Sequence, residues 1–205
     1  MNKLLPLLLT FLRVLLVPLI LFFLFFSKYE ELVRTAIVCL LFVTGSLSDF
    51  FDGYFARKFK AATRLGAFAD PLADKVFTLS IFVSFLFLPS LKIPGWVFIF
   101  VLLIFIRETF ITILRIYTAV KNIKMKTARH GKIKTTVQLT SQSVIMAILL
   151  LYALQDSYPE LALPFLLKNI LNFLPALLII LSSLVTLYSG ISYLQTNRFL
   201  IKMNR

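Results

Sequence analysis

Asp49-Phe-Phe-Asp52-Gly-Tyr-Phe-Ala-Arg is followed, after eight residues, by Gly-Ala-Phe-Ala-Asp70-Pro-Leu-Ala-Asp74. In this stretch four carboxylates stand at the inner ends of two very apolar segments. An ionisable group inside a membrane span costs roughly 2.5–3.5 kcal/mol on insertion scales. Each of the four acids therefore needs a bound cation or a hydrogen-bonding partner.

The spacing of the acids favours a cation. On a helix that turns about 100° per residue, Asp49 and Asp52 lie about 60° apart, and on a second helix Asp70 and Asp74 lie about 40° apart. Two such helices that face each other would gather four oxygen ligands, which suit Mg²⁺, Mn²⁺ or Ca²⁺. The alternative is a set of structural ion pairs, but few basic residues are near, and most of them belong to a solvated loop.

Small residues accompany the acids on the same helix faces. Gly53, Ala56 and Gly66 leave room for a ligand to approach the backbone. Arg57 adds a cation for phosphate oxygens. The stretch thus combines metal ligands with space and charge for a phosphate compound.

The composition is that of a polytopic membrane protein. The chain has 205 residues, of which 60% are hydrophobic, and its mean hydropathy is +0.92. We expect an all-α fold, a six-helix transmembrane bundle that forms one catalytic domain over residues 1–205, with spans near 4–26, 32–55, 66–88, 96–117, 133–154 and 174–194. Cys39 is the only cysteine, which excludes an intrachain disulfide.

The net charge of +13 gathers in two short loops and at the C-terminus. This distribution indicates orientation charges and contacts with anionic membrane lipids, and not nucleic-acid binding. The basic loops predict that both termini face the cytoplasm, together with the acid-bearing ends of the second and third spans. The sequence therefore predicts a multi-pass protein of the cell membrane with its active site at the cytoplasmic face.

The pattern D-x-x-D-G-x-x-A-R-x8-G-x3-D-x3-D resembles that of the CDP-alcohol phosphotransferases, and every fixed position is present. The resemblance implies transfer of a substituted phosphoryl group from a CDP-linked donor to an alcohol, with release of CMP. It implies a two-metal site for Mg²⁺ or Mn²⁺, with Asp49, Asp52, Asp70 and Asp74 as ligands. It also implies that Asp74 is the general base that takes the proton of the acceptor.

The same resemblance implies a binding site for the cytidine diphosphate group. Its lining would be Asp49, Gly53, Ala56, Arg57 and Gly66. In the first span, Thr10 and Arg13 belong to a T-x-x-R-x4-P pattern, which is similar to the family's opening pattern near the nucleotide. For Arg13 the alternative is a side chain that reaches out to the membrane interface.

Two further segments, IRETFITILR at 106–115 and GKIKTT at 131–136, resemble the bacterial phosphatidylglycerophosphate synthases. This resemblance implies CDP-diacylglycerol as donor and sn-glycerol 3-phosphate as acceptor. A phosphate-bearing acceptor needs fixed cations beyond the metals, and the candidates are Arg107, Arg115, Lys132 and Lys134. The alternatives are an interhelical ion pair with Glu108 for the arginines and orientation charges for the lysines.

Other functions stay open at this level. The nearest is a cardiolipin synthase of the same family, with phosphatidylglycerol as acceptor. A different class is a divalent-cation transporter, which would leave the glycines and Arg57 of the acidic stretch unexplained. The family resemblance and a face of small residues in the last span predict a homodimer; the face is formed by Ser182, Thr186, Ser189 and Gly190.

Overall fold

The computed structural model describes residues 5–59, 64–121, 130–161 and 163–197. Within these ranges it does not describe the side chains of 5–7, 9, 49–59, 64–71, 119–120, 130, 132 and 161. The described residues form six α-helices and no strand: α1 Leu5–Phe25, α2 Glu31–Phe59, α3 Arg64–Leu86, α4 Phe98–Val120, α5 His130–Ser157 and α6 Phe165–Thr196. The predicted all-α, six-helix architecture is confirmed.

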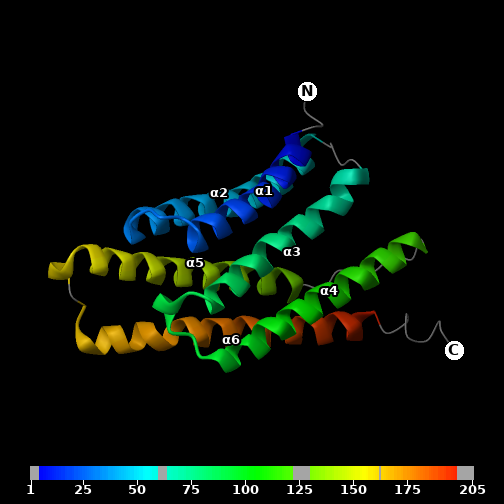
Figure 1. The fold of residues 1–205 in the computed structure, drawn as a ribbon. Coiled ribbons are helices and arrows are strands. Elements are labelled where there is room, and N and C mark those ends of the chain that lie inside the picture. Colours follow the sequence, from blue (N-terminus) through cyan, green and yellow to red (C-terminus); the bar gives the residue numbers. More distant parts are fainter. Residues whose placement is uncertain (1–4, 60–63, 122–129, 162, 198–205) are drawn as a thin grey trace.

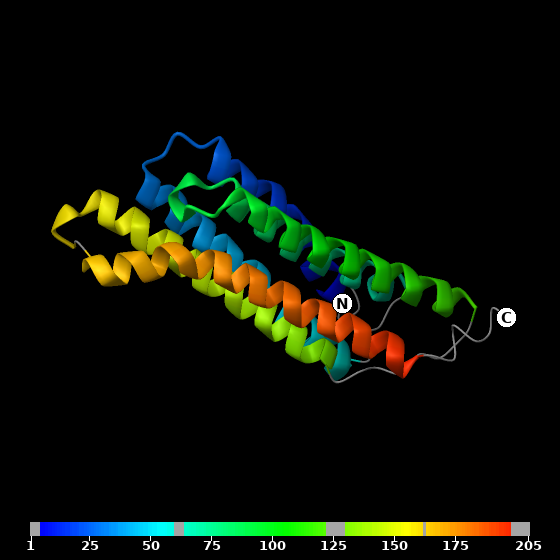
Figure 2. The ribbon, with the colours of Figure 1, turned by 90° about the horizontal axis from the view of Figure 1, so that it is seen from below.

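The helices form a closed bundle. Each helix packs on the next around the bundle: α1 packs on α3, α3 on α4, α4 on α6, α6 on α5, α5 on α2, and α2 again on α1. A further contact joins α3 to α5 across the interior. Figures 1 and 2 show these long helices running roughly along one axis, with the beginning of α1 and the end of α6 toward the same end.

Proline and glycine stand in two of the breaks between helices. Two short 3₁₀ turns, η1 Pro89–Leu91 and η2 Gly95–Val97, separate α3 from α4, and a third, η3 Pro159–Leu161, precedes α6. Lys92 between η1 and η2 adopts a left-handed conformation with φ 49°. Proline also stands inside α1 and α6, where the lost backbone hydrogen bond does not end the helix.

Two helices begin earlier than expected. α6 begins at Phe165, nine residues before the expected start of the sixth span, because its chain continues helically through Pro175. α5 begins at His130, so Lys132 and Lys134 belong to a helix and not to the basic loop in which the sequence pattern placed them. The membrane boundaries of all six spans stay predictions.

Apolar surface covers the outside of the bundle. Among the described residues, four helices are long and apolar enough to cross a membrane, over Glu31–Ser48, Gly95–Thr118, Ile133–Ser157 and Phe165–Thr196, and Thr10–Phe25 is a shorter apolar helix. Large side chains such as Phe26 and Phe165 are 75% and 77% exposed. Exposed phenylalanine on this scale is expected where lipid, and not water, is the solvent.

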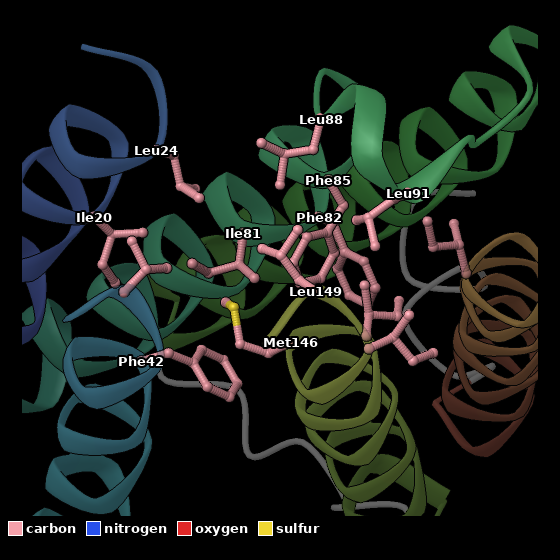
Figure 3. Packing of buried hydrophobic residues seen from close by; sticks show 14 of the residues in the cluster. Ile20, Leu24, Phe42, Ile81, Phe82, Phe85, Leu88, Leu91, Met146 and Leu149 are labelled. Carbon is pink, nitrogen blue, oxygen red and sulfur yellow. The ribbon is translucent and has the colours of Figure 1, made fainter. Parts of the chain in front are cut away.

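The interior of the bundle is packed with aliphatic and aromatic side chains from all six helices, and Figure 3 shows part of this core. Phe42 of α2 stacks on Phe77 of α3, with ring centroids 6.0 Å apart. Gly45 allows this approach, because a Cβ at that position would lie 2.5 Å from Cε2 of Phe77. This contact fixes the position of α2 relative to α3 along the axis of the bundle.

The small-residue face of α6 points into the bundle. Ser182 and Thr186 are fully buried, and Ser189 is 2% exposed. Ser182 donates a hydrogen bond to Ser141 Oγ at 2.9 Å, and Gln138 donates one to Thr186 Oγ1 at 3.0 Å, both across the contact with α5. This face is therefore used within one chain and gives no argument for a dimer, which stays a prediction.

Candidate active site

The contact between Gly45 and Phe77 is a reference point for the positions of the acids along the axis of the bundle. Asp49 follows Gly45 by four residues on α2, and Asp74 precedes Phe77 by three residues on α3. At about 1.5 Å of rise per residue, these two backbone positions lie about 6 Å and about 4.5 Å from the contact. Because α2 and α3 are antiparallel, both displacements lead toward the same end of the bundle (Figure 1).

The other acids continue in the same direction. Asp52 lies seven residues beyond Gly45, and Asp70 lies seven residues before Phe77. The helices thus place these backbone positions at matching heights along the bundle, and the metal site itself stays a prediction. The side chains of the other acids and of their neighbours are outside the described residues; these are Asp49, Asp52, Gly53, Ala56, Arg57, Gly66 and Asp70.

Asp74 is described and half-buried, and it lines a cavity inside the bundle. The cavity has a volume of about 30 Å³, which is room for one or two water molecules and not for a nucleotide. Its other lining residues come from α1, α2, α3 and α5: Arg13, Gly45, Ser46, Phe77, Thr78, Thr135, Gln138, Leu139 and Gln142. Asp74 therefore faces a small polar interior space where these four helices meet.

Arg13 shares this cavity with Asp74. Its side chain is 1% exposed and Thr10, one turn earlier on α1, is 4% exposed. The alternative in which Arg13 reaches out to the membrane interface is wrong, because packing of α1 against α2 and α3 turns this face inward. α1 thus brings a buried guanidinium to the cavity of Asp74, although 61 residues separate the two in the sequence.

A second polar centre surrounds Glu108 of α4, whose side chain is 4% exposed. Lys134 Nζ lies 2.6 Å from Glu108 Oε1, and Lys75 Nζ lies 2.9 Å from Glu108 Oε2. Arg107 Nη1 lies 3.0 Å from Glu108 Oε1. One carboxylate on α4 therefore pairs with cations from α3, α4 and α5. We call these four side chains the Glu108 cluster.

α6 holds the arginine of this cluster in place. Arg107 Nη2 donates a hydrogen bond to Ser189 Oγ at 3.1 Å. Gly190 leaves the space for the side chain, since a Cβ there would lie 3.0 Å from Arg107 Nε. The sequence pattern shows Ser189 and Gly190 only as small residues, whereas the structure shows that they accommodate a charged side chain.

The four predicted acceptor cations do not all come together. Arg107 and Lys134 belong to the Glu108 cluster, while the side chain of Lys132 is outside the described residues. Arg115 is exposed and lies with its guanidinium carbon 5.2 Å above the ring of Tyr193, whose hydroxyl accepts a hydrogen bond from Arg115 Nε at 3.4 Å. Seven residues of α4 separate Arg115 from Glu108, which is about 10 Å along the helix.

Comparison with known proteins identifies the family. Residues 3–188 match the family described as CDP-alcohol phosphatidyltransferase. The chain belongs to the CDP-alcohol phosphatidyltransferase family. This assignment confirms the resemblance drawn from the acidic stretch, and it makes the chain a transferase family member in which the acids of α2 and α3 carry the family pattern.

Several curated relatives of this transferase have one name, CDP-diacylglycerol–glycerol-3-phosphate 3-phosphatidyltransferase. The Haemophilus influenzae relative is 32% identical over 194 residues, which cover 93% of this chain and 91% of the relative. The Rickettsia felis relative is 34% identical over 146 residues, covering 71% and 76%. The Pectobacterium atrosepticum relative is 35% identical over 137 residues, covering 65% and 71%. With the apolar helices described above, these bacterial relatives show a multi-pass membrane protein.

Sequence reasoning missed two residues of this transferase that the structure places at its polar centres. Lys75 follows the last acid and has no role in the sequence patterns, but it is half-buried and bonded to Glu108. Gln142 is 1% exposed and donates a hydrogen bond to the backbone oxygen of Thr78 at 2.7 Å beside the cavity. The sequence signal for both residues is a polar side chain inside an apolar helical run. Such a side chain is costly in a membrane unless it has a partner.

The donor set of the acidic stretch fits a divalent metal. Four carboxylates at matching levels of two helices supply only oxygen ligands, which Mg²⁺ and Mn²⁺ accept. Among the described residues, no group of three or more His, Cys, Asp or Glu could hold a metal ion. Three of the four acids have side chains outside the described residues.

Proposed function

We propose that this transferase moves the phosphatidyl group of CDP-diacylglycerol to sn-glycerol 3-phosphate, giving phosphatidylglycerophosphate and CMP. The names of the relatives support this acceptor. The structural observation that supports it is the Glu108 cluster, in which three cations surround one acid. The four side chains carry two net positive charges, which complement a phosphate that carries nearly two negative charges.

The two polar centres adjoin each other. Asp74 and Lys75 are consecutive on α3, and Lys134 and Thr135 are consecutive on α5. On each helix, one residue of the pair lines the Asp74 cavity and the other belongs to the Glu108 cluster. An acceptor whose phosphate lies at the cluster therefore has its hydroxyl end close to Asp74.

The acids would hold a pair of Mg²⁺ or Mn²⁺ ions as the cofactor. Asp49, Asp52, Asp70 and Asp74 would be the ligands. When bound, such ions neutralise charge on the two phosphates of the donor and favour departure of CMP. The protein would position the donor with the small residues and cations that the family pattern assigns to the cytidine diphosphate group: Thr10, Arg13, Gly53, Ala56, Arg57 and Gly66.

The reaction exchanges one phosphorus–oxygen bond for another. The acceptor hydroxyl oxygen forms a bond to the phosphorus that carries diacylglycerol. The bond from that phosphorus to the oxygen bridging it to CMP breaks, and CMP leaves with the electron pair. Asp74 accepts the hydroxyl proton, and the carboxylate needs hydrogen-bond reach to that hydroxyl for the transfer.

The acceptor phosphate would bind first to Arg107 and Lys134. Both side chains are nearly buried, 11% and 12% exposed, so their contacts with an anion are little screened by water. Arg115, which is exposed, would add attraction farther from the cluster, and Lys132 stays a candidate. Among the described cations, this grading separates the inner Arg107 and Lys134 from the outer Arg115.

The membrane arrangement follows from the same charges. Both termini and the acidic ends of α2 and α3 would face the cytoplasm, where CMP and glycerol 3-phosphate are soluble. Diacylglycerol would remain in the bilayer. The protein would act in the cell membrane, and association as a homodimer is part of this proposal.

Purified protein, CDP-diacylglycerol and a panel of alcohols test the proposal, with CMP release as readout. We expect glycerol 3-phosphate to support release and free glycerol to fail. Preferred use of phosphatidylglycerol would instead make the enzyme a cardiolipin synthase. Metal transport into sealed vesicles without any CMP release would favour a divalent-cation transporter, a class against which the family assignment already speaks.

A further inference from the structure

Lys75 is the cation of the Glu108 cluster that neither the family pattern nor the acceptor segments assign. Its ammonium group lies 2.9 Å from Glu108 Oε2 and donates a second hydrogen bond to the backbone oxygen of Glu108 at 3.3 Å. These two contacts tie the turn of α3 that carries Asp74 to α4. Lys75 thus belongs to the cluster that we propose as the site of the acceptor phosphate.

The cluster retains unused hydrogen-bond donors. An ammonium group has three N–H donors and a guanidinium has five. Lys134 donates one described hydrogen bond, to Glu108, and Lys75 donates two. Arg107 Nε is buried and has no partner among the described residues. The three cations therefore keep donors for an anion beyond those that Glu108 accepts.

Charge points to the same kind of ligand. Among the described residues, Glu108 is the only carboxylate paired with Lys75, Arg107 or Lys134. Two net positive charges in a largely buried site favour a divalent anion. A phosphate monoester combines that charge with three acceptor oxygens.

We propose that Lys75 is a further ligand of the acceptor phosphate, and that Glu108 is the positioning residue that holds Lys75, Arg107 and Lys134 together before the phosphate binds. This inference rests on the proposed function, which supplies the phosphate-bearing acceptor. Without Glu108 the three cations repel one another and separate. The phosphate would then have to gather them on binding, and that ordering weakens affinity.

Four variants test the two roles by steady-state kinetics. Lys75→Met should raise the KM for glycerol 3-phosphate about tenfold or more, while the KM for CDP-diacylglycerol stays within about twofold. Lys75→Arg, which keeps the charge, should restore most of the acceptor affinity. Glu108→Gln should raise the acceptor KM about tenfold, and Glu108→Asp should raise it less.

A matched control removes a lysine elsewhere. Lys168 is exposed near the beginning of α6, 21 residues from Ser189, or about 30 Å along the helix. Lys168→Met should leave both KM values unchanged. An unchanged acceptor KM in Lys75→Met, or an unchanged or lower acceptor KM in Glu108→Gln, overturns the inference. An equal rise in both KM values in Lys75→Met also overturns it, because that pattern indicates a general structural role.

Binding of inorganic phosphate separates this inference from the proposed function. We expect phosphate to raise the thermal unfolding temperature of the wild type, and Lys75→Met to abolish that rise while Lys168→Met keeps it. No rise in the wild type, or the same rise in Lys75→Met, overturns the inference even where glycerol 3-phosphate is a substrate. Failure of glycerol 3-phosphate as acceptor, with phosphate binding that depends on Lys75, overturns the proposed reaction and leaves the anion site standing.

Discussion

The two polar centres of this bundle differ in how their residues are brought together. The predicted acidic centre, which comprises Asp49, Asp52, Asp70 and Asp74 and adjoins the Asp74 cavity, takes its four carboxylates from one stretch of 26 residues, at spacings of three and four. The Glu108 cluster takes its members from α3, α4 and α5, with 33 residues between Lys75 and Glu108 and 26 between Glu108 and Lys134. The predicted metal site is thus local in the sequence, whereas the Glu108 cluster, the proposed anion site, depends on tertiary packing.

The difference extends to charge. The acidic centre gathers negative charge and needs cations, whereas the cluster carries two net positive charges and favours an anion. Consecutive residues on α3 and on α5 divide between the two centres. In the proposed function, the bundle would hold a metal-bound donor and a phosphate-bearing acceptor side by side, with Asp74 between them.

Removal of divalent metal should abolish the activity that depends on the acidic centre and leave the Glu108 cluster intact. We expect excess chelator to abolish CMP release and added Mg²⁺ or Mn²⁺ to restore it, because four adjacent carboxylates repel without a cation. Phosphate binding, followed by thermal shift, should survive chelation. Full turnover in excess chelator would refute the metal assignment.

Asp74→Asn should remove the base and keep the other three acids. We expect turnover to fall by about 10²–10⁴-fold, which is the usual contribution of a general base. Binding of CDP-diacylglycerol should remain measurable, while Asp49→Asn, which removes a metal ligand, should lose both binding and turnover. Near-normal turnover in Asp74→Asn contradicts the role of this carboxylate.

Arg107→Ala and Arg115→Ala should separate the inner from the outer cations. Each charge-assisted contact is worth roughly 1.5–3 kcal/mol, so Arg107→Ala should raise the acceptor KM about tenfold to a hundredfold. Arg115 is exposed, and screening by water should limit its effect to about threefold. Thermal unfolding must be followed in parallel, because loss of Arg107 also removes a partner of Glu108. Equal effects of the two variants would argue against the grading.

Substitution of three glycines by alanine should have the smallest and most selective effects on stability and on the acceptor KM. Gly45→Ala places a Cβ 2.5 Å from the ring of Phe77, and such overpacking should cost about 1–3 kcal/mol of folding free energy. Gly190→Ala meets the flexible side chain of Arg107 at 3.0 Å and should raise the acceptor KM more than it lowers the unfolding temperature. Gly95→Ala is the control, because nothing lies within 4 Å of its added Cβ. A Gly190→Ala enzyme with an unchanged acceptor KM would contradict the role of α6 in placing Arg107.

The fold was accessible from sequence for physical reasons, and the acidic centre stays a prediction from the spacing of the acids. Long apolar runs indicate helices in a membrane, and the helical period turns spacings of three and four into one face. The burial of Arg13 and the partners of Lys75 were not accessible, because each depends on which face a helix turns toward its neighbours. Composition did not show whether the small residues of α6 face another subunit or the interior, and the structure turns them inward. The early beginning of α6 was missed because helical continuation through Pro175 depends on tertiary packing.

Lys134→Met tests the central claim, that donor and acceptor bind at different polar centres. Lys134 makes the shortest contact of the Glu108 cluster, 2.6 Å to Glu108 Oε1, and its neighbour Thr135 lines the Asp74 cavity. The measurement is the pair of KM values for the purified variant and the wild type. We predict an acceptor KM raised about tenfold or more, with the KM for CDP-diacylglycerol within about twofold. A rise confined to CDP-diacylglycerol, or an equal rise for both substrates, would contradict the separation of the two centres.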